Sequence, residues 1–268
     1  MKKTIELFSL EKKNIIVAGG AGQIGFAMVK ILADAGANIF IADVDCEMAN
    51  QKIKKDLLLK DKVSVLKLDV TKMKSIDLFD KKLGNIKIHG LVNSFHFKGN
   101  TRKLDTTSNF FADFENYPED AWDLVHDVNL KGSFLLSKKL LPKMKNCNAS
   151  IVNISSTYGI VSANKSIYGD SGINSPVAYA TSKAALINLT RYMSTHLVDF
   201  GIRVNCLSPG GVFNNQAKDF LKKYCEKTPL KRMANAEDYQ GAILFLLSKA
   251  SSYMTGANLV VDGGWTAW

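Results

Sequence analysis

The chain has 268 residues and a formal net charge of +10 at pH 7, from 35 Lys or Arg against 25 Asp or Glu. Its lysines are scattered in pairs, a pattern typical of a solvated surface rather than of a nucleic-acid reader, although the charge could also attract an anionic small molecule. Neither a signal peptide nor a membrane span is expected, because no apolar run is long enough. The four cysteines lack metal-ligand spacing, so we expect reduced thiols in a cytoplasmic protein and no metal site.

Short apolar runs alternate with helical patterns along residues 1–268, and this alternation predicts a single α/β domain. The fold expected is a doubly wound parallel sheet of the Rossmann type, with about seven strands and helices on both faces. In chain order, the expected strands are 14–18, 38–42, 63–68, 88–92, 150–154, 203–207 and 258–261. Helices are expected from about residue 24 to just before Gly36, from Pro118 towards Lys145, and from about Val177 to Asp199.

Two connecting segments are unusually long, residues 94–117 and residues 157–176. Loops of this length in a compact domain are usually functional, and ligands of doubly wound sheets bind beyond the carboxyl ends of the strands. Because both segments follow strands, we expect them to border the substrate site. The phenylalanines of the first segment either pack it against the protein or line a site for a hydrophobic substrate.

A glycine-rich turn connects the first expected strand to the first long helix. Glycine permits a tight turn and lets the backbone approach a pyrophosphate, whose charge the free N–H groups at the helix start can bind. The strand before it and the helix after it are typical of a dinucleotide-binding turn. The residues expected to contact the cofactor here are Gly19, Gly22, Gln23, Ile24 and Gly25.

Asp43 comes at the end of the second expected strand and supplies the acidic residue that accompanies such a turn. A carboxylate at this place binds the ribose hydroxyls of NAD and repels the 2′-phosphate of NADP. Neither residues 20–23 nor residues 44–47 contain a Lys or Arg that would bind that phosphate. The sequence therefore predicts NAD as the cofactor, with NADP less favoured.

Tyr179 and Lys183 are four residues apart in the helix expected from about Val177, so they lie on one helix face. A phenol ordinarily has a pKa of about 10, and a neighbouring ammonium favours the phenolate. Tyr179 could then exchange a proton with an alcohol while a hydride moves to or from a nicotinamide. Ser156, after the fifth strand, can bond the same substrate oxygen, and Asn129 is a polar residue inside a helical stretch that needs an explanation.

These motifs, in this order, resemble those of the short-chain dehydrogenase/reductase family over essentially the whole chain. The pieces that match are the glycine turn, Asp69-Val70, Asn93, Asn129-Leu130, Ile154-Ser155-Ser156, Tyr179 with Lys183, Pro209-Gly210 and Val261-Asp262-Gly263-Gly264. The resemblance implies a Rossmann domain with a catalytic tetrad, a small-molecule substrate, and assembly into a homotetramer or at least a dimer.

The same resemblance implies a role for each matching residue. Tyr179 would be the acid/base, Ser156 would position the substrate, and Lys183 would hold the nicotinamide ribose and lower the pKa of the tyrosine. Asn129 would hold a proton-relay water through the lysine. Further cofactor contacts are implied for Asp69 and Val70 at the adenine, and for Asn93, Pro209, Gly210 and Val212.

Four features depart from the usual pattern of the family. Gln23 replaces the middle glycine, so the glycine spacing matches the extended, sugar-nucleotide-modifying subgroup, whereas the chain length and the Val261–Gly264 ending match the compact one. The usual Asn-Asn-Ala-Gly reads Asn-Ser-Phe-His, and Ser156 and Tyr179 lie 23 residues apart, which is longer than usual. The threonine that often follows Pro-Gly is also absent. The last three differences concentrate where the nicotinamide and the substrate would bind.

A narrower resemblance concerns the substrate. The segments from Ser156 to Tyr179 and from Ser208 to Gln216 are similar to the flagellin modification protein A group, a bacterial subgroup linked to nonulosonic sugar synthesis and glycan decoration. This similarity implies a sugar, sugar phosphate or nucleotide sugar as the substrate. His96 either packs within its loop or contacts that substrate. The candidate substrate contacts are His96, Lys98, Arg102, Tyr158 and Asn214.

Three other interpretations remain open. A hydrophobic ketone or acyl substrate would use the same hydride transfer, with the phenylalanines as its lining. A sugar-nucleotide epimerase or dehydratase would reduce and reoxidise bound NAD within one turnover, so that free NADH would not accumulate. An NAD-sensing or scaffold protein without activity is opposed by the complete set of tetrad residues, because a sensor needs no activated tyrosine.

Overall fold

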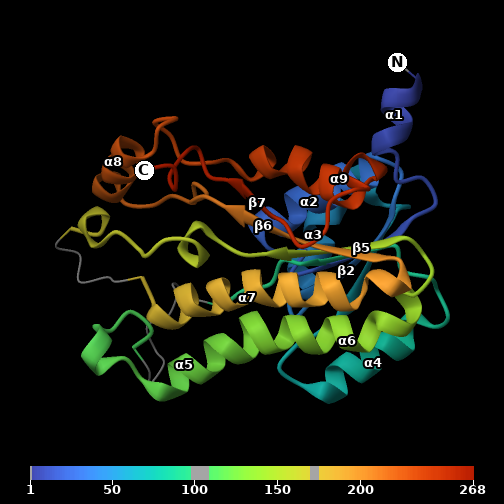
Figure 1. The fold of residues 1–268 in the computed structure, drawn as a ribbon, viewed down its shortest axis with the longest axis horizontal. Helices are drawn as coiled ribbons and strands as arrows, with labels where there is room; N and C mark the ends of the chain where they lie inside the picture. The colour runs from blue at the N-terminus through green and yellow to red at the C-terminus, as the bar shows by residue number, and fades with distance from the viewer. Residues whose placement is uncertain (1, 98–108, 170–174) are drawn as a thin grey trace.

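The computed structural model describes residues 2–97, 109–169 and 175–268. Within these residues one sheet crosses the molecule, and its neighbouring strands are parallel (Figure 1). The strands are β1 (Asn14–Ala18), β2 (Asn38–Asp43), β3 (Val63–Lys67), β4 (Gly90–Asn93), β5 (Ala149–Ile154), β6 (Ile202–Pro209) and β7 (Asn258–Val261). Their order across the sheet is β3-β2-β1-β4-β5-β6-β7, which is the expected doubly wound arrangement.

The central strands are buried on both faces, which explains why their sequences are continuous apolar runs. β5 is buried at every residue, and residues 15–18 of β1 are at most 1% exposed. β4 lies between them, because Ala18 of β1 pairs with Asn93 of β4 and Asn93 pairs with Asn153 of β5. The carboxyl ends of these three strands therefore lie side by side, where the sequence places the glycine turn, Asn93 and Ser156.

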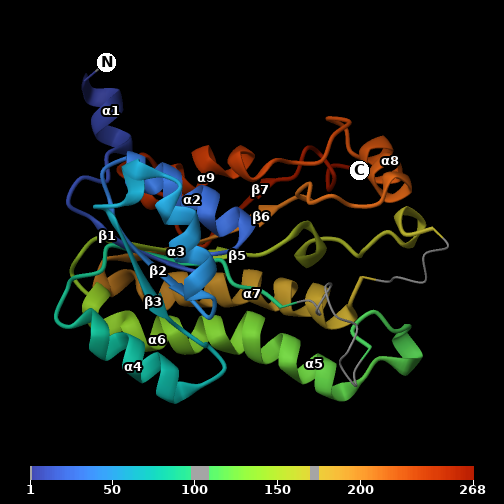
Figure 2. The same cartoon turned by 180° about the vertical axis from the view of Figure 1, so that it is seen from behind.

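Helices cover both faces of the sheet (Figures 1 and 2). One face carries α2 (Gln23–Asp34), α3 (Cys46–Lys54) and α9 (Gln240–Leu247), and the other carries α4 (Met73–Leu83), α6 (Gly132–Met144) and α7 (Val177–His196). Apolar side chains from each set fill a separate core on their own face of the sheet. The other α-helices of the described residues are α1 (Lys2–Phe8), α5 (Glu119–His126) and α8 (Lys218–Lys227).

The long helical stretch expected from Pro118 is interrupted near its middle. α5 is followed by a π-helical turn over Asp127–Lys131, and α6 begins directly after that turn. Single π-helical turns inside helices are frequent at functional sites. Asn129 lies in this turn, so its place in the sequence coincides with a break in the regular helical hydrogen bonding.

The ends of several elements differ from expectation by a few residues. The last turn expected of the helix from Val177 is a separate 3-10 segment at 198–200, because Gly201 takes a left-handed φ of 70° and redirects the chain into β6. β6 is also longer than expected, since its pairing with β7 continues to Pro209. The other 3-10 segments are at 57–59, 114–116, 157–159, 165–167, 236–239 and 249–251.

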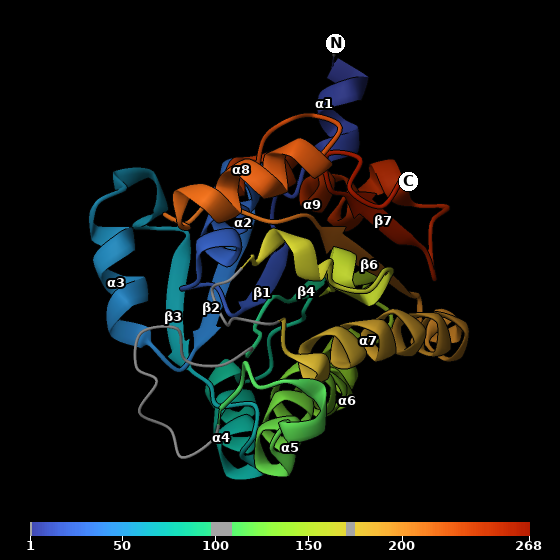
Figure 3. The same cartoon turned by 90° about the vertical axis from the view of Figure 1, so that its left-hand side faces the viewer.

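The carboxyl ends of the strands open onto one end of the molecule (Figure 3). Seen from that end, α8 lies on one side and α5 and α7 on the other, and residues 157–169 run between them. These residues pack against α8 through the apolar cluster that contains Ile167 and Tyr224. The described part of the second long loop therefore lies at the carboxyl end of the sheet, between α7 and α8.

No helix of the described residues is both long and apolar enough to cross a membrane. Over the same residues, no group of three or more His, Cys, Asp or Glu side chains is placed to hold a metal ion. The four cysteines are free thiols, and only Cys206 among them is buried.

Candidate functional site

The glycine turn leaves β1 and enters α2 with almost no room for side chains. Gly19 takes a φ of 81°, and a Cβ on it would lie 2.5 Å from the backbone N of Phe95. A Cβ on Gly25 would overlap the carbonyl oxygen of Gly19. These two glycines are therefore required by the backbone itself, which then presents the first amides of α2, at Gln23 and Ile24, outward.

Asp43 holds this turn from the end of β2. Its Oδ2 accepts a hydrogen bond from the backbone N of Ala21 at 2.9 Å, and its Oδ1 accepts one from the N of Asp45 at 3.0 Å. The carboxylate thus lies directly beside the turn, as the interpretation of the sequence required. The first amides of a helix have no intrahelical acceptor, so the turn and Asp43 fit the pyrophosphate and a ribose of a dinucleotide.

Gln23 makes a contact that the sequence did not suggest. Its Nε2 donates a hydrogen bond to the carbonyl oxygen of Phe213 at 2.8 Å, linking the turn to the segment after β6. Val212, in that segment, pairs with Ala234 as an isolated parallel bridge. The residues after β6 that were expected to contact the cofactor are therefore tied to the glycine turn.

Asp69 and Val70 follow β3 and lie at the same end of the sheet. The Asp69 carboxylate accepts hydrogen bonds from the N and the hydroxyl of Thr71 and pairs with Lys72 at 2.9 Å. Burial alone would raise the pKa of Asp69, but the bonds from Thr71 and Lys72 outweigh it and hold that pKa below its usual value. Asp69 is thus an ionised residue that stabilises its own turn, and Val70 is 7% exposed beside Gly132.

Asn93 belongs to a buried polar network rather than to an open surface. Its Nδ2 donates to the Oδ1 of Asn153 at 2.8 Å and to the hydroxyl of Ser137 at 3.3 Å. Asn153 in turn donates to the hydroxyl of Thr190 in α7 at 2.9 Å. The chain of hydrogen bonds connects β4, β5 and α7, so Asn93 links the central strands to the helix that carries Tyr179.

Tyr179, Ser156 and Lys183 come together at the carboxyl end of β5. Lys183 donates to the carbonyl oxygen of Ile154 at 2.7 Å, and its amine lies 5.7 Å from the centre of the Tyr179 ring. Ser156 forms a side-chain hydrogen bond with Tyr179 and accepts one from the N of Tyr158 at 3.1 Å. The three side chains predicted from widely separated positions thus share one site.

The protonation of this site differs from what the sequence suggests. Burial raises the pKa of Tyr179, and the hydrogen bond from Ser156 only partly opposes that effect. Burial also lowers the pKa of Lys183 to about 8, although the nearby Cys206 opposes the shift. Lys183 therefore does not bring the pKa of Tyr179 below its usual value in this structure, because burial disfavours the charged forms of both side chains.

Asn129 is fully buried and acts as a clamp between three segments. Its Oδ1 accepts from the N of Phe97 at 2.7 Å, and its Nδ2 donates to the carbonyl oxygen of Phe97 at 3.0 Å and to the hydroxyl of Ser182 at 3.0 Å. Its own carbonyl accepts from Ser133 at 2.9 Å. The side chain thus fixes the start of the first long loop against α7, next to Lys183.

The expected substrate contacts are placed unequally. The His96 ring meets the Tyr179 ring edge-on, with 6.2 Å between their centres. Tyr158 is half-buried, and its hydroxyl lies 3.4 Å from that of Tyr168. Asn214 is exposed, and its N donates to the Oε1 of Gln216. Two further expected contacts, Lys98 and Arg102, lie outside the described residues.

The phenylalanines of the first long loop divide into two groups. Phe97 and Phe110 meet edge-to-face at 5.2 Å, and Phe110 is buried. Phe114 is 81% exposed. The described part of this loop therefore packs on itself through two rings, as expected, while Phe114 does not take part.

Two residues of the site escaped the sequence analysis. Tyr168, in the second long loop, affects the pKa values of both Tyr158 and Tyr179, so the three phenols lie close together. Lys52, in α3, donates to the carbonyl oxygen of Ala21 in the glycine turn at 2.7 Å. Neither residue belongs to a short motif, and only the packing of separate elements brings them to the site.

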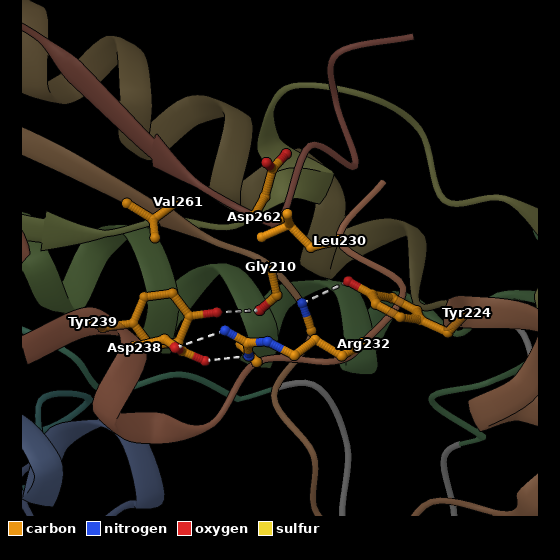
Figure 4. Close-up of a pocket in the computed structure, with 11 residues that line it drawn as sticks. Gly210, Tyr224, Leu230, Arg232, Asp238, Tyr239, Val261 and Asp262 are labelled. Atoms are coloured by element: carbon orange, nitrogen blue, oxygen red, sulfur yellow. Dashed lines mark hydrogen bonds and ion pairs between the residues drawn. The ribbon is translucent and has the colours of Figure 1, made fainter. Parts of the chain in front are cut away.

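A cavity of about 200 Å3 lies beside the segment after β6 (Figure 4). The hydroxyl of Tyr224 accepts from the N of Gly211, and that of Tyr239 donates to the carbonyl oxygen of Gly210. Arg232 pairs with both carboxylate oxygens of Asp238, at 2.6 and 2.9 Å. The bonds of Tyr224 and Tyr239 therefore hold the backbone of Gly210 and Gly211 in place.

The apolar side chains of α6 and α7 differ in how far they are exposed. Phe134 and Tyr192 are 45% and 61% exposed, and Ala184 is exposed as well. Ile187 is buried, and Leu135 packs against the core beneath α6. Those two residues face inward because they fall on the side of each helix that meets the sheet, so they do not belong to an outer surface.

Comparison with known proteins agrees with this geometry. A family model described as enoyl-(acyl carrier protein) reductase matches residues 19–266. A curated relative, the post-translational flagellin modification protein A of Campylobacter coli, is 33% identical over 96% of this chain and 99% of its own length. The match therefore extends over both long loops and both ends of the sheet.

Solved structures share the fold over nearly their whole length. A short chain dehydrogenase from Leptospira borgpetersenii with bound NAD+ is 34% identical with a TM-score of 0.80, covering 96% of this chain and 93% of that one. The Pseudomonas aeruginosa RhlG/NADP active-site complex is 25% identical with a TM-score of 0.84, covering 97% and 98% of the two chains. Similar proteins thus bind either dinucleotide.

Proposed function

The chain belongs to the short-chain dehydrogenase/reductase family of NAD(P)-dependent oxidoreductases, and we propose that it uses NAD to interconvert a secondary alcohol and a ketone. The proposed substrate is a sugar, sugar phosphate or nucleotide sugar of bacterial surface-glycan synthesis. The observation that carries the proposal is the meeting of Tyr179, Ser156 and Lys183 next to the glycine turn.

In this proposal Tyr179 carries the proton of the substrate oxygen. In reduction its phenol donates a proton to the carbonyl oxygen while the carbonyl carbon accepts the hydride, and oxidation is the reverse. The raised pKa of Tyr179 keeps the phenol protonated at neutral pH, which suits the donor role. Bound NADH supplies the hydride. Ser156 bonds the same substrate oxygen and aligns it with Tyr179.

Lys183 and Asn129 would assist the proton transfer by Tyr179 without contacting the substrate. The Lys183 amine, held by the Ile154 carbonyl, lies in reach of the Tyr179 ring and of a ribose placed against α7. Asn129 holds Phe97 and Ser182 in place, and a water between Asn129 and Lys183 would return protons to Tyr179. His96, edge-on to Tyr179, would then border the reacting carbon.

Asp43 is the reason for proposing NAD. Its carboxylate lies at the turn where the adenosine ribose binds in such folds and would accept bonds from both ribose hydroxyls. The remaining contacts to the cofactor would come from the turn, Val70, Asn93 and the segment 209–212. The segment after β6 is suited to this because Gln23 joins it to the turn.

The substrate class rests on two supports. The first is the flagellin modification relative from Campylobacter coli, which is 33% identical over 96% of this chain. In addition, the hydroxyls of Tyr158 and Tyr168 lie 3.4 Å apart next to Tyr179, and phenol hydroxyls of this kind suit a ligand rich in hydroxyl groups. With Asn214 they form the proposed sugar-binding side of the site.

A hydrophobic ketone or acyl substrate is the second candidate. The description of the matching family model, enoyl-(acyl carrier protein) reductase, favours it. A redox-neutral epimerase or dehydratase is the third, motivated by the spacing of Gly19, Gly22 and Gly25. NADH release against panels of sugar phosphates, nucleotide sugars and 3-hydroxyacyl thioesters separates all three, because the last reaction type releases none.

We further propose that the protein is a homo-oligomer. Phe134 of α6 and Tyr192 of α7 expose large apolar surfaces on neighbouring helices, and burying them against a second copy would be favourable. Light scattering at micromolar concentration tests this, and a monomeric mass would contradict it.

Tyr179→Phe tests the catalytic assignment. Removing the hydroxyl deletes the proton donor, so turnover should fall by about 10²–10⁴-fold while NADH still binds with the wild-type Kd. Tyr253→Phe, at a fully exposed residue outside that surface, is the matched control and should leave turnover unchanged. Unchanged turnover in Tyr179→Phe would refute the assigned role.

A further inference from the structure

Lys52 brings a positive charge to the glycine turn from a helix outside the motif. Its amine donates to the carbonyl oxygen of Ala21 at 2.7 Å, while Asp43 accepts from the N of the same residue at 2.9 Å. An anion and a cation therefore hold the two polar atoms of one residue of the turn. The backbone N and O of a single residue are only a few ångströms apart. The Asp43 carboxylate and the Lys52 amine therefore lie within about 10 Å of each other, the distance over which charges interact at about 0.1 M salt.

The position of the Lys52 amine is fixed by more than one contact. It lies over the ring of Phe26, with 5.2 Å to the ring centre, and its side chain is half-buried between α2 and α3. The carboxylates whose charges act on it are Asp43 and Asp45, which follow one another at the end of β2. Lys54 and Lys55, at the end of α3, are exposed to solvent, so they differ from Lys52 in this respect.

We propose that Lys52 is a specificity-determining residue that lets the site accept NADP alongside NAD. The inference rests on the proposed function, because it assumes that a dinucleotide ribose binds at Asp43. A 2′-phosphate placed there is repelled by Asp43, and the amine of Lys52 offsets that repulsion from across the Ala21 peptide. Asp43 alone would give strict NAD dependence, whereas the pair gives a preference that can be moved in either direction.

The test measures dissociation constants of NADH and NADPH by the fluorescence of the reduced nicotinamide, without any substrate. Lys52→Met should raise the Kd of NADPH about tenfold more than that of NADH. Lys52→Arg keeps the positive charge and should keep the wild-type ratio of the two Kd values. Lys54→Met is the matched control, since Lys54 is exposed on the same helix, and it should leave the ratio unchanged. The extra increase in the Kd of NADPH should also become smaller in about 0.5 M salt, because salt at this concentration largely screens surface charges.

Three outcomes would overturn the inference. If Lys52→Met weakens both nucleotides equally, Lys52 only shapes the turn. If neither Kd changes, the residue has no part in binding. If wild-type protein binds neither nucleotide, the proposed function fails together with this inference, whereas the first two outcomes leave Tyr179 and the proposed reaction untouched.

Discussion

At the cofactor end of the site, the glycine turn and Asp43 are held by backbone contacts between β1, α2 and β2, which follow one another in the chain. At the substrate end, Tyr158 and Tyr168 come from the second long loop and Tyr224 comes from α8, and their side chains meet only in the folded protein. The cofactor end is thus specified by short-range sequence, and the substrate end by the packing of distant segments. Substitutions at the first should change dinucleotide binding, and substitutions at the second should change substrate selection.

The largest expected effect comes from Gly25→Ala, which tests the cofactor end. A Cβ at this position overlaps the carbonyl of Gly19, and an overpacked backbone contact costs about 3 kcal/mol. NADH affinity, measured by fluorescence titration, should therefore fall about 100-fold. Gly241→Ala is the control, because a Cβ there meets nothing within 4 Å. Equal affinities in the two variants would show that the turn does not need its glycine.

Asn129→Ala tests the junction between the two ends. The substitution leaves the N–H and the carbonyl of Phe97 and the hydroxyl of Ser182 without this partner. Buried groups left unsatisfied cost about 1–3 kcal/mol, so the free energy of unfolding in urea should drop by about 2 kcal/mol. Asn50→Ala, at an exposed position of α3, should change it little. A wild-type stability for Asn129→Ala would mean that Phe97 finds other partners.

The fold could be predicted from the sequence because strands that are buried on both faces are continuous apolar runs. Apolar runs such as the one in β5 read as strands covered on both faces, and the observed strand bounds differ from the expected ones by at most two residues at an end. The end of α7 was placed less well, since Gly201 and the preceding 3-10 segment stop it early. Helix ends depend on local geometry that periodicity does not encode.

The candidate site was predictable only where one motif fixes it. The expected meeting of Tyr179, Lys183 and Ser156 agrees with the structure, because a helix face and a strand end determine it. Lys52 and Tyr168 were missed. No spacing rule connects α3 with the glycine turn, or the second long loop with Tyr179. The raised pKa of Tyr179 in this structure was not predicted either, because it depends on the depth of burial, which sequence spacing does not give.

The pH dependence of stability tests how deeply Lys183 is buried. In the folded protein its pKa is lowered to about 8, whereas in the unfolded chain it returns to about 10.4. Between these values the unfolded chain binds more protons, so the contribution of Lys183 to stability rises with pH across this window. The free energy of unfolding of wild type relative to Lys183→Met should therefore increase by about 2 kcal/mol from pH 7 to about pH 9.5.

The comparison with Lys183→Met is needed because other groups titrate in the same window. Burial raises the pKa of Cys206 to about 11. Because the folded protein then keeps this proton longer than the unfolded chain does, the contribution of Cys206 to the stability of the protein falls as pH increases. The difference between the two proteins removes most of that contribution. A difference that stays constant from pH 7 to about pH 9.5 would show that Lys183 titrates normally.

The smallest expected effect is at the substrate end, in Tyr158→Phe. One hydrogen bond to the substrate contributes about 1–1.5 kcal/mol, so KM for the sugar substrate identified by NADH release should rise about tenfold. The value of kcat and the Kd of NADH should stay unchanged, because the hydroxyl of Tyr158 faces Tyr168 and not the glycine turn. Tyr253→Phe, at a fully exposed residue, is the control. If Tyr158→Phe instead lowers KM or improves turnover of an acyl thioester, the pair of hydroxyls does not select a sugar, and the hydrophobic substrate becomes the better assignment for this end of the site.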